Sequence, residues 1–250
     1  MATFVLVHGA WQGASTWDLV VPRLWAAGHR VYTPTLIGLG ANAHRLTPQV
    51  NLDMHIQDVV GVINYERLQD VILVGHSYAG MIITGVAELV RERLGRLVYV
   101  DAFIPDDGQS AMQLFPERFQ TAFRDQARSD GDGWRLLGSE KRLDLWGLKE
   151  GPARDYVRSK LCDFSINCFE QPLMLPANAS ATLDRTYIAC VGEGYPARPV
   201  FAQFAERAKA EGWDYHELPT GHDCHVEMPE AFCELLLSAV GTRAPAGAIS

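Results

Sequence analysis

A serine placed for nucleophilic chemistry lies in the segment Val74-Gly75-His76-Ser77-Tyr78-Ala79-Gly80. An apolar run precedes it and a long helical pattern follows it, so we expect Ser77 at a sharp turn from strand to helix. Such a turn strains the backbone and holds the hydroxyl out above the sheet edge. Ala79 stands where the usual pattern has glycine, and one extra methyl group is tolerable there. The alternative is that Ser77 only caps the following helix.

A serine hydroxyl needs a base, and His222 is the best placed of eight histidines. It follows a predicted strand in Leu218-Pro219-Thr220-Gly221 and precedes the last helical pattern. The carboxyl ends of parallel strands meet at one edge of a sheet, so this loop can reach the Ser77 turn. His76 is expected to point elsewhere, and His8 to brace the turn at Gly9 through a hydrogen bond.

The base in turn needs a carboxylate that orients it. Glu193 follows the strand that ends Cys190-Val191-Gly192, and this order of serine, acid and histidine fits the expected architecture. Asp101 lies at the end of another predicted strand and is the rival. We favour Glu193 and keep Asp101 as the alternative acid.

Acyl transfer also needs donors for a developing oxyanion. The backbone N–H of Tyr78, directly after the serine, is one candidate. The second is the N–H of Ala10, in a loop that Gly9 allows to approach closely. Around these groups we expect an apolar pocket that accepts aryl groups, with Trp11, Tyr78, Phe103, Trp134 and Trp146 as substrate-binding residues. Other aromatic residues of the same region are Phe115, Phe119, Phe123, Phe164 and Phe169.

Alternating strand and helix patterns at both ends of the chain must position these residues. Strands are expected over Thr3–His8, Arg30–Thr33, Asp70–Val74, Leu97–Val100, Arg185–Val191 and Trp213–Leu218. Helices are expected over Thr16–Ala27, Leu52–Tyr65, Ala79–Leu94, Phe201–Glu211 and Glu230–Val240. This alternation predicts an α/β fold with a mostly parallel sheet of about six strands, flanked by helices.

The stretch 105–184 interrupts this alternation with turn signals, aromatic residues and short helical patches, but no clear strand. It is too long for a plain connection, so we interpret it as an inserted, mainly helical cap or lid. Residues 1–104 and 185–241 then form the core domain, and 242–250 a frayed tail.

Composition excludes several classes of protein. The chain has 250 residues, 48% hydrophobic and 21% charged, with a formal net charge of −8. These figures are typical of globular proteins, and the acidic balance argues against a nucleic-acid partner. No apolar run is long enough for a membrane span or a signal segment, so we expect no membrane partner. A homodimer is left open.

The five cysteines are scattered, without a C-x-x-C pair, and predict reduced thiols in a cytoplasmic protein. A zinc site made of His222, Cys224 and His225 is disfavoured because the ligands are too crowded around one ion. We expect no metal and no cofactor.

Taken together, the Ser77 turn, the His8-Gly9-Ala10-Trp11 loop and the Gly221-His222-Asp223 loop resemble the α/β-hydrolase superfamily. Within that superfamily the chain resembles the small cap-bearing group that contains salicylate-binding-type methyl-ester esterases and plant hydroxynitrile lyases. It looks like a bacterial-type esterase of this group. The matching segments are Phe4–Trp11, Val71–Met81, Leu97–Ser110 and Tyr187–His222. The acid of that group is usually Asp, and here the matching position is Glu193.

The resemblance implies a serine hydrolase of the carboxylesterase type that cleaves small apolar or aryl esters through an acyl-enzyme on Ser77. A carbamate, amide or lactone would use the same groups. The lyases of the group have a hydroxyl-bearing residue in the oxyanion loop and a lysine after the catalytic histidine. Ala10 and Asp223 stand there in this chain, which favours hydrolysis over a lyase. A ligand-binding receptor on the same scaffold is the third alternative.

Overall fold

Six strands form one sheet in which every neighbouring pair is parallel, in the order β2-β1-β3-β4-β7-β8. The computed structural model describes residues 1–241, and the predicted tail 242–250 lies outside the described residues. The predicted parallel sheet of about six strands is confirmed. The strands are β1 (Thr3–Val7), β2 (Arg30–Tyr32), β3 (Val71–His76), β4 (Leu94–Val100), β7 (Asp184–Cys190) and β8 (Asp214–Leu218).

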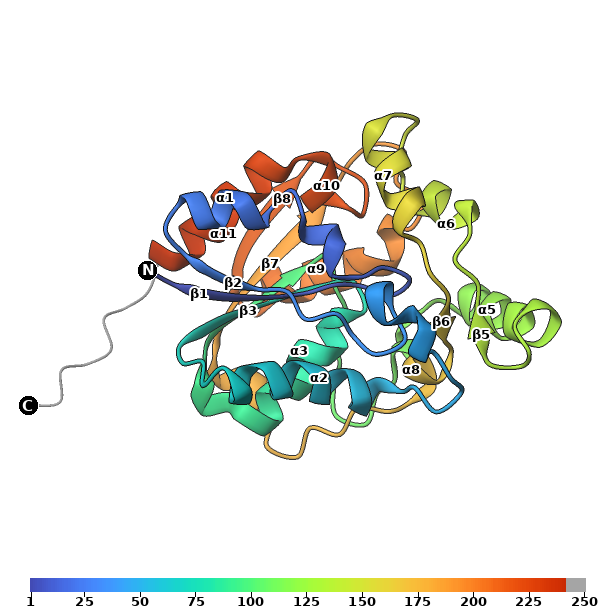
Figure 1. Cartoon of the computed structure of the whole chain (residues 1–250), viewed down its shortest axis with the longest axis horizontal. Coiled ribbons are helices and arrows are strands. Elements are labelled where there is room, and N and C mark those ends of the chain that lie inside the picture. Colours follow the sequence, from blue (N-terminus) through green and yellow to red (C-terminus); the bar gives the residue numbers. More distant parts are fainter. Residues whose placement is uncertain (242–250) are drawn as a thin grey trace, which may run out of the picture.

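Helices cover both faces of the sheet, which explains why β3 is buried along its whole length and begins with four apolar residues. In Figure 1, α1 (Val21–Ala26) and α11 (Pro229–Gly241) lie on one face, and α2 (Leu52–Tyr65) and α3 (Ala79–Val90) lie on the other. A further helix, α9 (Arg198–Ala210), packs against β7 and β8. Because all six strands run in the same direction, the loops that follow β1, β3, β4, β7 and β8 gather at one edge.

Two predicted helices are shorter in the structure. The expected helix Thr16–Ala27 is divided into a 3-10 turn, Ala14–Trp17, and α1, which has Pro22 in its first turn. Proline lacks the N–H that a helix interior needs, so it marks a helix start. The expected helix Ala79–Leu94 ends at Val90 and is followed by a 3-10 turn, Arg91–Arg93. Gly95 therefore lies within β4 and does not end the helix.

The segment between β4 and β7, which we call the cap segment (105–184), is mainly helical as expected. Its helices are α4 (Ala111–Leu114), α5 (Glu117–Asp130), α6 (Glu140–Leu145), α7 (Pro152–Lys160) and α8 (Asn167–Glu170). Figure 1 places α5, α6 and α7 at the end of the sheet opposite the N-terminus, where the loops that follow the strands gather.

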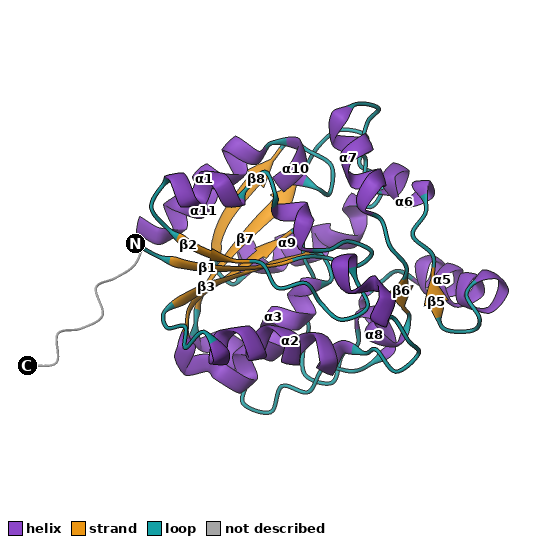
Figure 2. Ribbon diagram, in the orientation of Figure 1, coloured by secondary structure: helices purple, strands orange, loops and turns teal. Residues whose placement is uncertain are grey.

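The prediction that the cap segment contains no clear strand is wrong. Figure 2 shows two short strands, β5 (Arg135–Leu136) and β6 (Phe164–Ser165), which pair antiparallel apart from the main sheet. Two residues per strand are too few for a period-2 pattern to be visible in the sequence. The division into core and cap domains stays a prediction.

Candidate active site

Ser77 lies in a strained turn between β3 and α3. Its φ is +59°, in the left-handed region that residues with a side chain adopt at an energetic cost. Its N–H donates to the carbonyl of Val100 on the neighbouring strand β4, at 3.0 Å. The N-cap position of α3 is occupied by Tyr78. The structure thus has the predicted strand-to-helix turn and gives no support to Ser77 as a helix cap.

His222 lies in the loop after β8, just before the short helix α10 (Cys224–Glu227), and faces the same cavity as Ser77. Its side chain is 2% exposed, and its ring stacks on Phe201 with 4.7 Å between ring centroids. Its backbone N–H donates to the carbonyl of Trp146 in the cap segment, at 2.8 Å. The histidine is therefore held by the core on one side and by the cap segment on the other.

Asp101, and not Glu193, is the carboxylate beside His222. The Oδ2 atom of Asp101 lies 2.6 Å from Nδ1 of His222, and the Asp101 side chain is 2% exposed. Asp101 follows β4 with a φ of +42°, and its N–H donates to Ile188 on β7 at 2.7 Å. This bend at the strand end aims the carboxylate at the histidine.

The preference for Glu193 is therefore contradicted by the geometry. Glu193 is exposed and makes no hydrogen bond or ion pair with residues 1–241. The chain continues past β7 along the loop after β8, because the N–H of Gly192 donates to the carbonyl of Thr220 at 2.8 Å. That path carries Glu193 beyond the histidine and out into solvent.

Tyr195 is a site residue that the sequence analysis missed. Its hydroxyl lies 2.7 Å from Oδ2 of Asp101 and 2.9 Å from Nδ1 of His222. Burial, and then the negative charge of Asp101, raise the pKa of Tyr195 well above its usual value, so the phenol stays protonated and donates to the carboxylate. No sequence motif predicts a tyrosine beside the acid and the histidine. Tyr195 follows Gly194 in an irregular loop, where no periodic pattern indicates which way a side chain points.

The two predicted oxyanion donors lie close to Ser77 and have free N–H groups. Ala10 and Tyr78 are buried, and neither backbone N–H donates a hydrogen bond to any residue within 1–241. A Cβ on Gly9 would lie 3.1 Å from Cβ of Ser77, so the loop after β1 passes directly beside the serine. His8 braces this loop as expected, with its Nδ1 2.9 Å from the carbonyl of Gly9.

The cavity in front of Ser77 and His222 is mostly aromatic. Of the predicted substrate-binding residues, Trp11, Tyr78, Phe103 and Trp146 line it. Trp134 does not line it, so this expectation is wrong; it packs in the cap segment instead, where its carbonyl accepts from Ile166. The sequence analysis did not identify Phe201, Leu145 or Arg142, which also line the cavity. They come from α9 and α6, whose orientation toward the site no local pattern specifies.

A buried polar cluster lies behind His222, where His76, Asp223 and His225 have side-chain atoms within 4.8 Å of one another. The Nε2 atom of His76 lies 3.0 Å from the carbonyl of His222, and the amide of Gln12 donates to Asp223 at 2.6 Å. Burial lowers the pKa of His225 to about 3 and raises the pKa of Asp223. Two imidazoles and a carboxylate are donors that a divalent cation accepts. This set differs from the disfavoured set of His222, Cys224 and His225.

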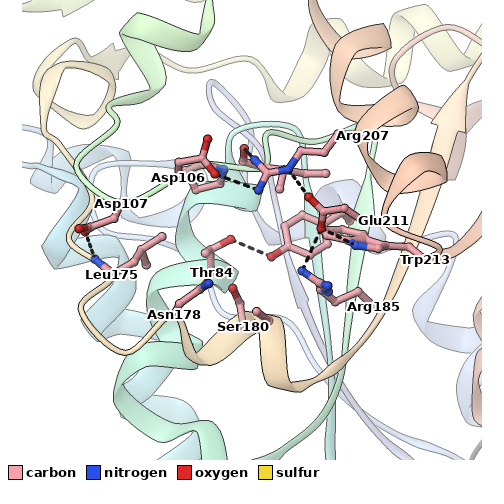
Figure 3. Close-up of a pocket in the computed structure, with 14 residues that line it drawn as sticks. Thr84, Asp106, Asp107, Leu175, Asn178, Ser180, Arg185, Arg207, Glu211 and Trp213 are labelled. Carbon is pink, nitrogen blue, oxygen red and sulfur yellow. Dashed lines mark hydrogen bonds and ion pairs between the residues drawn. The ribbon is translucent and has the colours of Figure 1, made fainter.

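A separate pocket of about 260 Å³ lies away from Ser77 and is lined by charged residues. Figure 3 shows that these residues pair with one another: Arg207 reaches Asp106 and Glu211, and Arg185 also reaches Glu211. None of the residues that line this pocket belongs to the Ser77 site.

Among the described residues, none of the helices is both long enough and apolar enough to cross a membrane.

Comparison with known proteins identifies the family of the chain. A model of the alpha/beta hydrolase family matches residues 4–235. The chain is 39% identical over 246 residues to a carbendazim hydrolyzing esterase of Nocardioides sp. (strain SG-4G), an alignment that covers 94% of this chain and 98% of that protein. It is 30% identical over 170 residues to methylesterase 2 of Arabidopsis thaliana, covering 65% of this chain and 60% of that protein.

Solved structures with the same fold are also found. An extracellular alpha/beta-hydrolase from a Paenibacillus species superimposes with a TM-score of 0.82 at 26% identity, covering 96% of this chain and 99% of that one. That enzyme is described as sharing structural and functional homology with tobacco salicylic acid binding protein 2. A pyrethroid hydrolase from Sphingobium faniae JZ-2 shares the fold, with a TM-score of 0.73 at 22% identity over 98% of both chains. The chain therefore belongs to the alpha/beta hydrolase family and is a carboxylesterase-like hydrolase.

Proposed function

We propose that the chain hydrolyses small aromatic or apolar esters through an acyl-enzyme on Ser77, with His222 as base and Asp101 as the orienting acid. His222 takes the proton of Ser77 as the hydroxyl oxygen attacks the ester carbonyl carbon. The N–H groups of Ala10 and Tyr78 hold the oxyanion. His222 then protonates the departing alcohol, and a water molecule repeats the attack on the acyl-enzyme.

One observation carries this proposal: a strained serine and an acid-bound histidine line the same aromatic cavity. The φ of +59° at Ser77 and the 2.6 Å contact between His222 and Asp101 are both features that a structural role alone does not require. The contact at Nδ1 fixes the imidazole so that Nε2 is the atom left for the serine.

The test is hydrolysis of 4-nitrophenyl acetate and butyrate, together with labelling by a fluorophosphonate that reacts with activated serines. We expect turnover and a covalent mass increase on Ser77 in the unaltered protein, and loss of both in Ser77→Ala. Asp101→Asn should lower kcat about 1,000-fold or more, because the histidine loses its orientation and the charge that stabilises imidazolium.

Glu193→Gln is the matched control, since it removes one carboxylate near the same strand ends. It should keep activity within about threefold, because a change at an exposed surface residue has little effect on the folded structure. If Glu193→Gln loses activity while Asp101→Asn keeps it, the proposed acid is wrong. Well-folded protein that neither turns over an ester nor reacts with the phosphonate contradicts the hydrolase and leaves the receptor alternative.

Carbamate hydrolysis is a second candidate, favoured by one observation. The relative that aligns along nearly the whole chain is named for hydrolysing carbendazim, which is a methyl carbamate. We therefore include carbendazim among the substrates and follow release of its aminobenzimidazole by chromatography. Turnover that depends on Ser77 would extend the reaction from esters to carbamates.

The lyase alternative is less well supported by the side chains around His222. Asp223 directly follows the histidine, is fully buried and accepts a hydrogen bond from Gln12. Ala10 has no hydroxyl with which to hold a cyanohydrin. Mandelonitrile cleavage to benzaldehyde at a rate above that of ester hydrolysis would reverse this assignment.

For location we propose the cytoplasm. The five cysteines are unpaired thiols, and four of them are buried. This state fits a reducing compartment.

A further inference from the structure

One charged side chain lines the aromatic cavity without touching the reacting groups. Arg142, on α6 of the cap segment, is 6% exposed. Its Cζ atom lies 3.4 Å from the ring centroid of Trp11, so the guanidinium rests on the face of the indole. Nε donates to the carbonyl of Leu137 at 2.9 Å, and Nη2 donates to the side chain of Gln126 at 2.9 Å.

The charge of this guanidinium is not neutralised by an ion pair. Within residues 1–241 no carboxylate lies within 4.0 Å of Arg142, whereas the neighbouring cap arginines Arg154 and Arg158 each pair with acidic residues. The two oxygens that accept its hydrogen bonds are neutral, and its Nη1 atom makes no hydrogen bond to the described residues. Asp163 attracts the guanidinium only from beyond 4.0 Å and pairs with Arg135 instead. Burial lowers the pKa of Arg142 to about 9, so the group is still charged at neutral pH.

A buried charge of this kind carries a desolvation cost that a new acceptor would reduce. Apart from His222, the remaining lining residues are mostly aromatic and offer no cationic side chain. A substrate ring that packs among these aromatic side chains with an acceptor directed at the guanidinium would supply that partner. Hydrogen bonds that involve a charged partner are stronger than neutral ones, so this contact would discriminate between rings.

We propose that Arg142 is a specificity residue, which selects aromatic esters whose ring carries a hydrogen-bond acceptor, either a ring nitrogen or a ring carboxylate. This inference rests on the proposed function, because it names the substrate class of the Ser77 site. Arg142 would act by binding and orienting the ring, while Ser77 and His222 carry out the same acyl transfer on every substrate. A plain phenyl ring would still bind through its apolar surface.

The test compares methyl benzoate with methyl esters that differ only in the acceptor. These are methyl nicotinate and isonicotinate, with a ring nitrogen, and monomethyl isophthalate and terephthalate, with a ring carboxylate. Each kcat/KM is divided by the rate constant for hydroxide hydrolysis of the same ester, which removes intrinsic reactivity. We expect at least one acceptor-bearing ester to exceed methyl benzoate by about tenfold or more. A preference for the pyridine esters assigns a neutral acceptor, and a preference for the carboxylates assigns an anionic one.

Variants decide whether Arg142 causes that preference. Arg142→Met should reduce the ratio to within about threefold of unity, and Arg142→Lys should keep part of it because a cation remains. Arg124→Met is the matched control: Arg124 is a cap arginine on α5 that pairs with Glu170 on the surface, so the ratio should be unchanged. Because Arg142 also holds Leu137 and Gln126, each variant is first checked for thermal unfolding and for phosphonate labelling of Ser77.

Two results would overturn the inference: equal normalised rates for all five esters, or a preference that survives in a folded Arg142→Met. These outcomes are separate from failure of the proposed function. If methyl benzoate is hydrolysed without any preference for acceptors, only the role of Arg142 is lost. If no ester is hydrolysed and Ser77 is not labelled, the proposed function itself fails.

Discussion

The hydroxyl of Tyr195 gives Asp101 a second hydrogen bond at the oxygen that faces His222. Both contacts converge on Oδ2, at 2.7 Å from the phenol and 2.6 Å from the imidazole. The other oxygen, Oδ1, accepts from the backbone N–H of Cys190 at 3.3 Å. These donors together hold the carboxylate in a fixed orientation against the imidazole. Tyr195 is thus a positioning residue, which acts on the reaction only through Asp101 and His222.

We predict that Tyr195→Phe lowers kcat about tenfold and leaves KM within about twofold. Without the phenol, Asp101 loses one of the hydrogen bonds that hold its carboxylate against His222, and a hydrogen bond to a charged group contributes about 1.5 kcal/mol or more. The measurement is kcat and KM for ester hydrolysis in the two proteins. A loss that appears in KM, with kcat unchanged, would show that the hydroxyl only supports packing of the cavity.

Side-chain direction is what residue-level sequence reasoning could not supply. The strands that precede Ser77, Asp101 and Glu193 are visible as apolar runs, whereas the strand that precedes His222 is largely polar. Whether Asp101 or Glu193 faces the histidine depends on a left-handed bend at one of them and on the path of a loop at the other. Neither feature has a sequence signal, and Arg142 was missed for the same reason.

Close packing of α3 against the loop after β4 fixes the turn that holds Ser77. Gly80 lies in the first turn of α3, where a Cβ would come within 2.1 Å of the carbonyl oxygen of Phe103. Because the contacted atom belongs to the backbone, rotating a side chain cannot relieve this clash. Phe103 also lines the cavity, so the same contact sets its position relative to Ser77.

Gly80→Ala should therefore destabilise the protein by about 2 kcal/mol or more, since overpacking forces the backbone apart. Gly61→Ala is the matched control, because Gly61 lies within α2 and a Cβ there would meet nothing within 4 Å. The control should be neutral or stabilising by up to about 1 kcal/mol, from the higher helix propensity of alanine. Denaturant unfolding of both variants is the measurement, and equal stabilities would contradict the packing argument.

Helices and strands with a strong periodic pattern can be predicted from the sequence. Elements that are very short, or whose ends depend on tertiary contacts, cannot. The amphipathic pattern over Leu52–Tyr65 predicts a helix with the observed bounds, and in the structure Asn51 is its N-cap. The two-residue strands β5 and β6 exist only through their pairing with each other. The end of α3 at Val90 likewise depends on where β4 joins the sheet, which local propensity does not encode.

At the scale of the whole molecule, several fully buried histidines make the fold sensitive to acid. Burial lowers the pKa of His8 and of His55 to about 4, and that of His225 to about 3. Between pH 6.5 and these values the unfolded chain binds protons that the folded chain does not. Stability is therefore complete above pH 6.5 and decreases as the pH falls toward 4. Glu227, whose pKa burial raises to about 7, acts in the opposite direction.

His55→Gln tests this linkage at one site, with His44→Gln as the control. The ring of His55 contacts the hydroxyl of Tyr78 and the carbonyl of Ile37, and a glutamine amide can contact the same groups, whereas His44 is exposed. We expect the free energy of unfolding of the unaltered protein to be lower at pH 5 than at pH 7. In His55→Gln this decrease should be smaller by about 2 kcal/mol, one protonation having been removed from the unfolded state. His44→Gln should show the unaltered decrease, because replacing an exposed side chain has little effect on the folded structure. Urea unfolding at the two pH values gives each difference directly, and parallel curves for all three proteins would show that His55 does not contribute to the acid sensitivity.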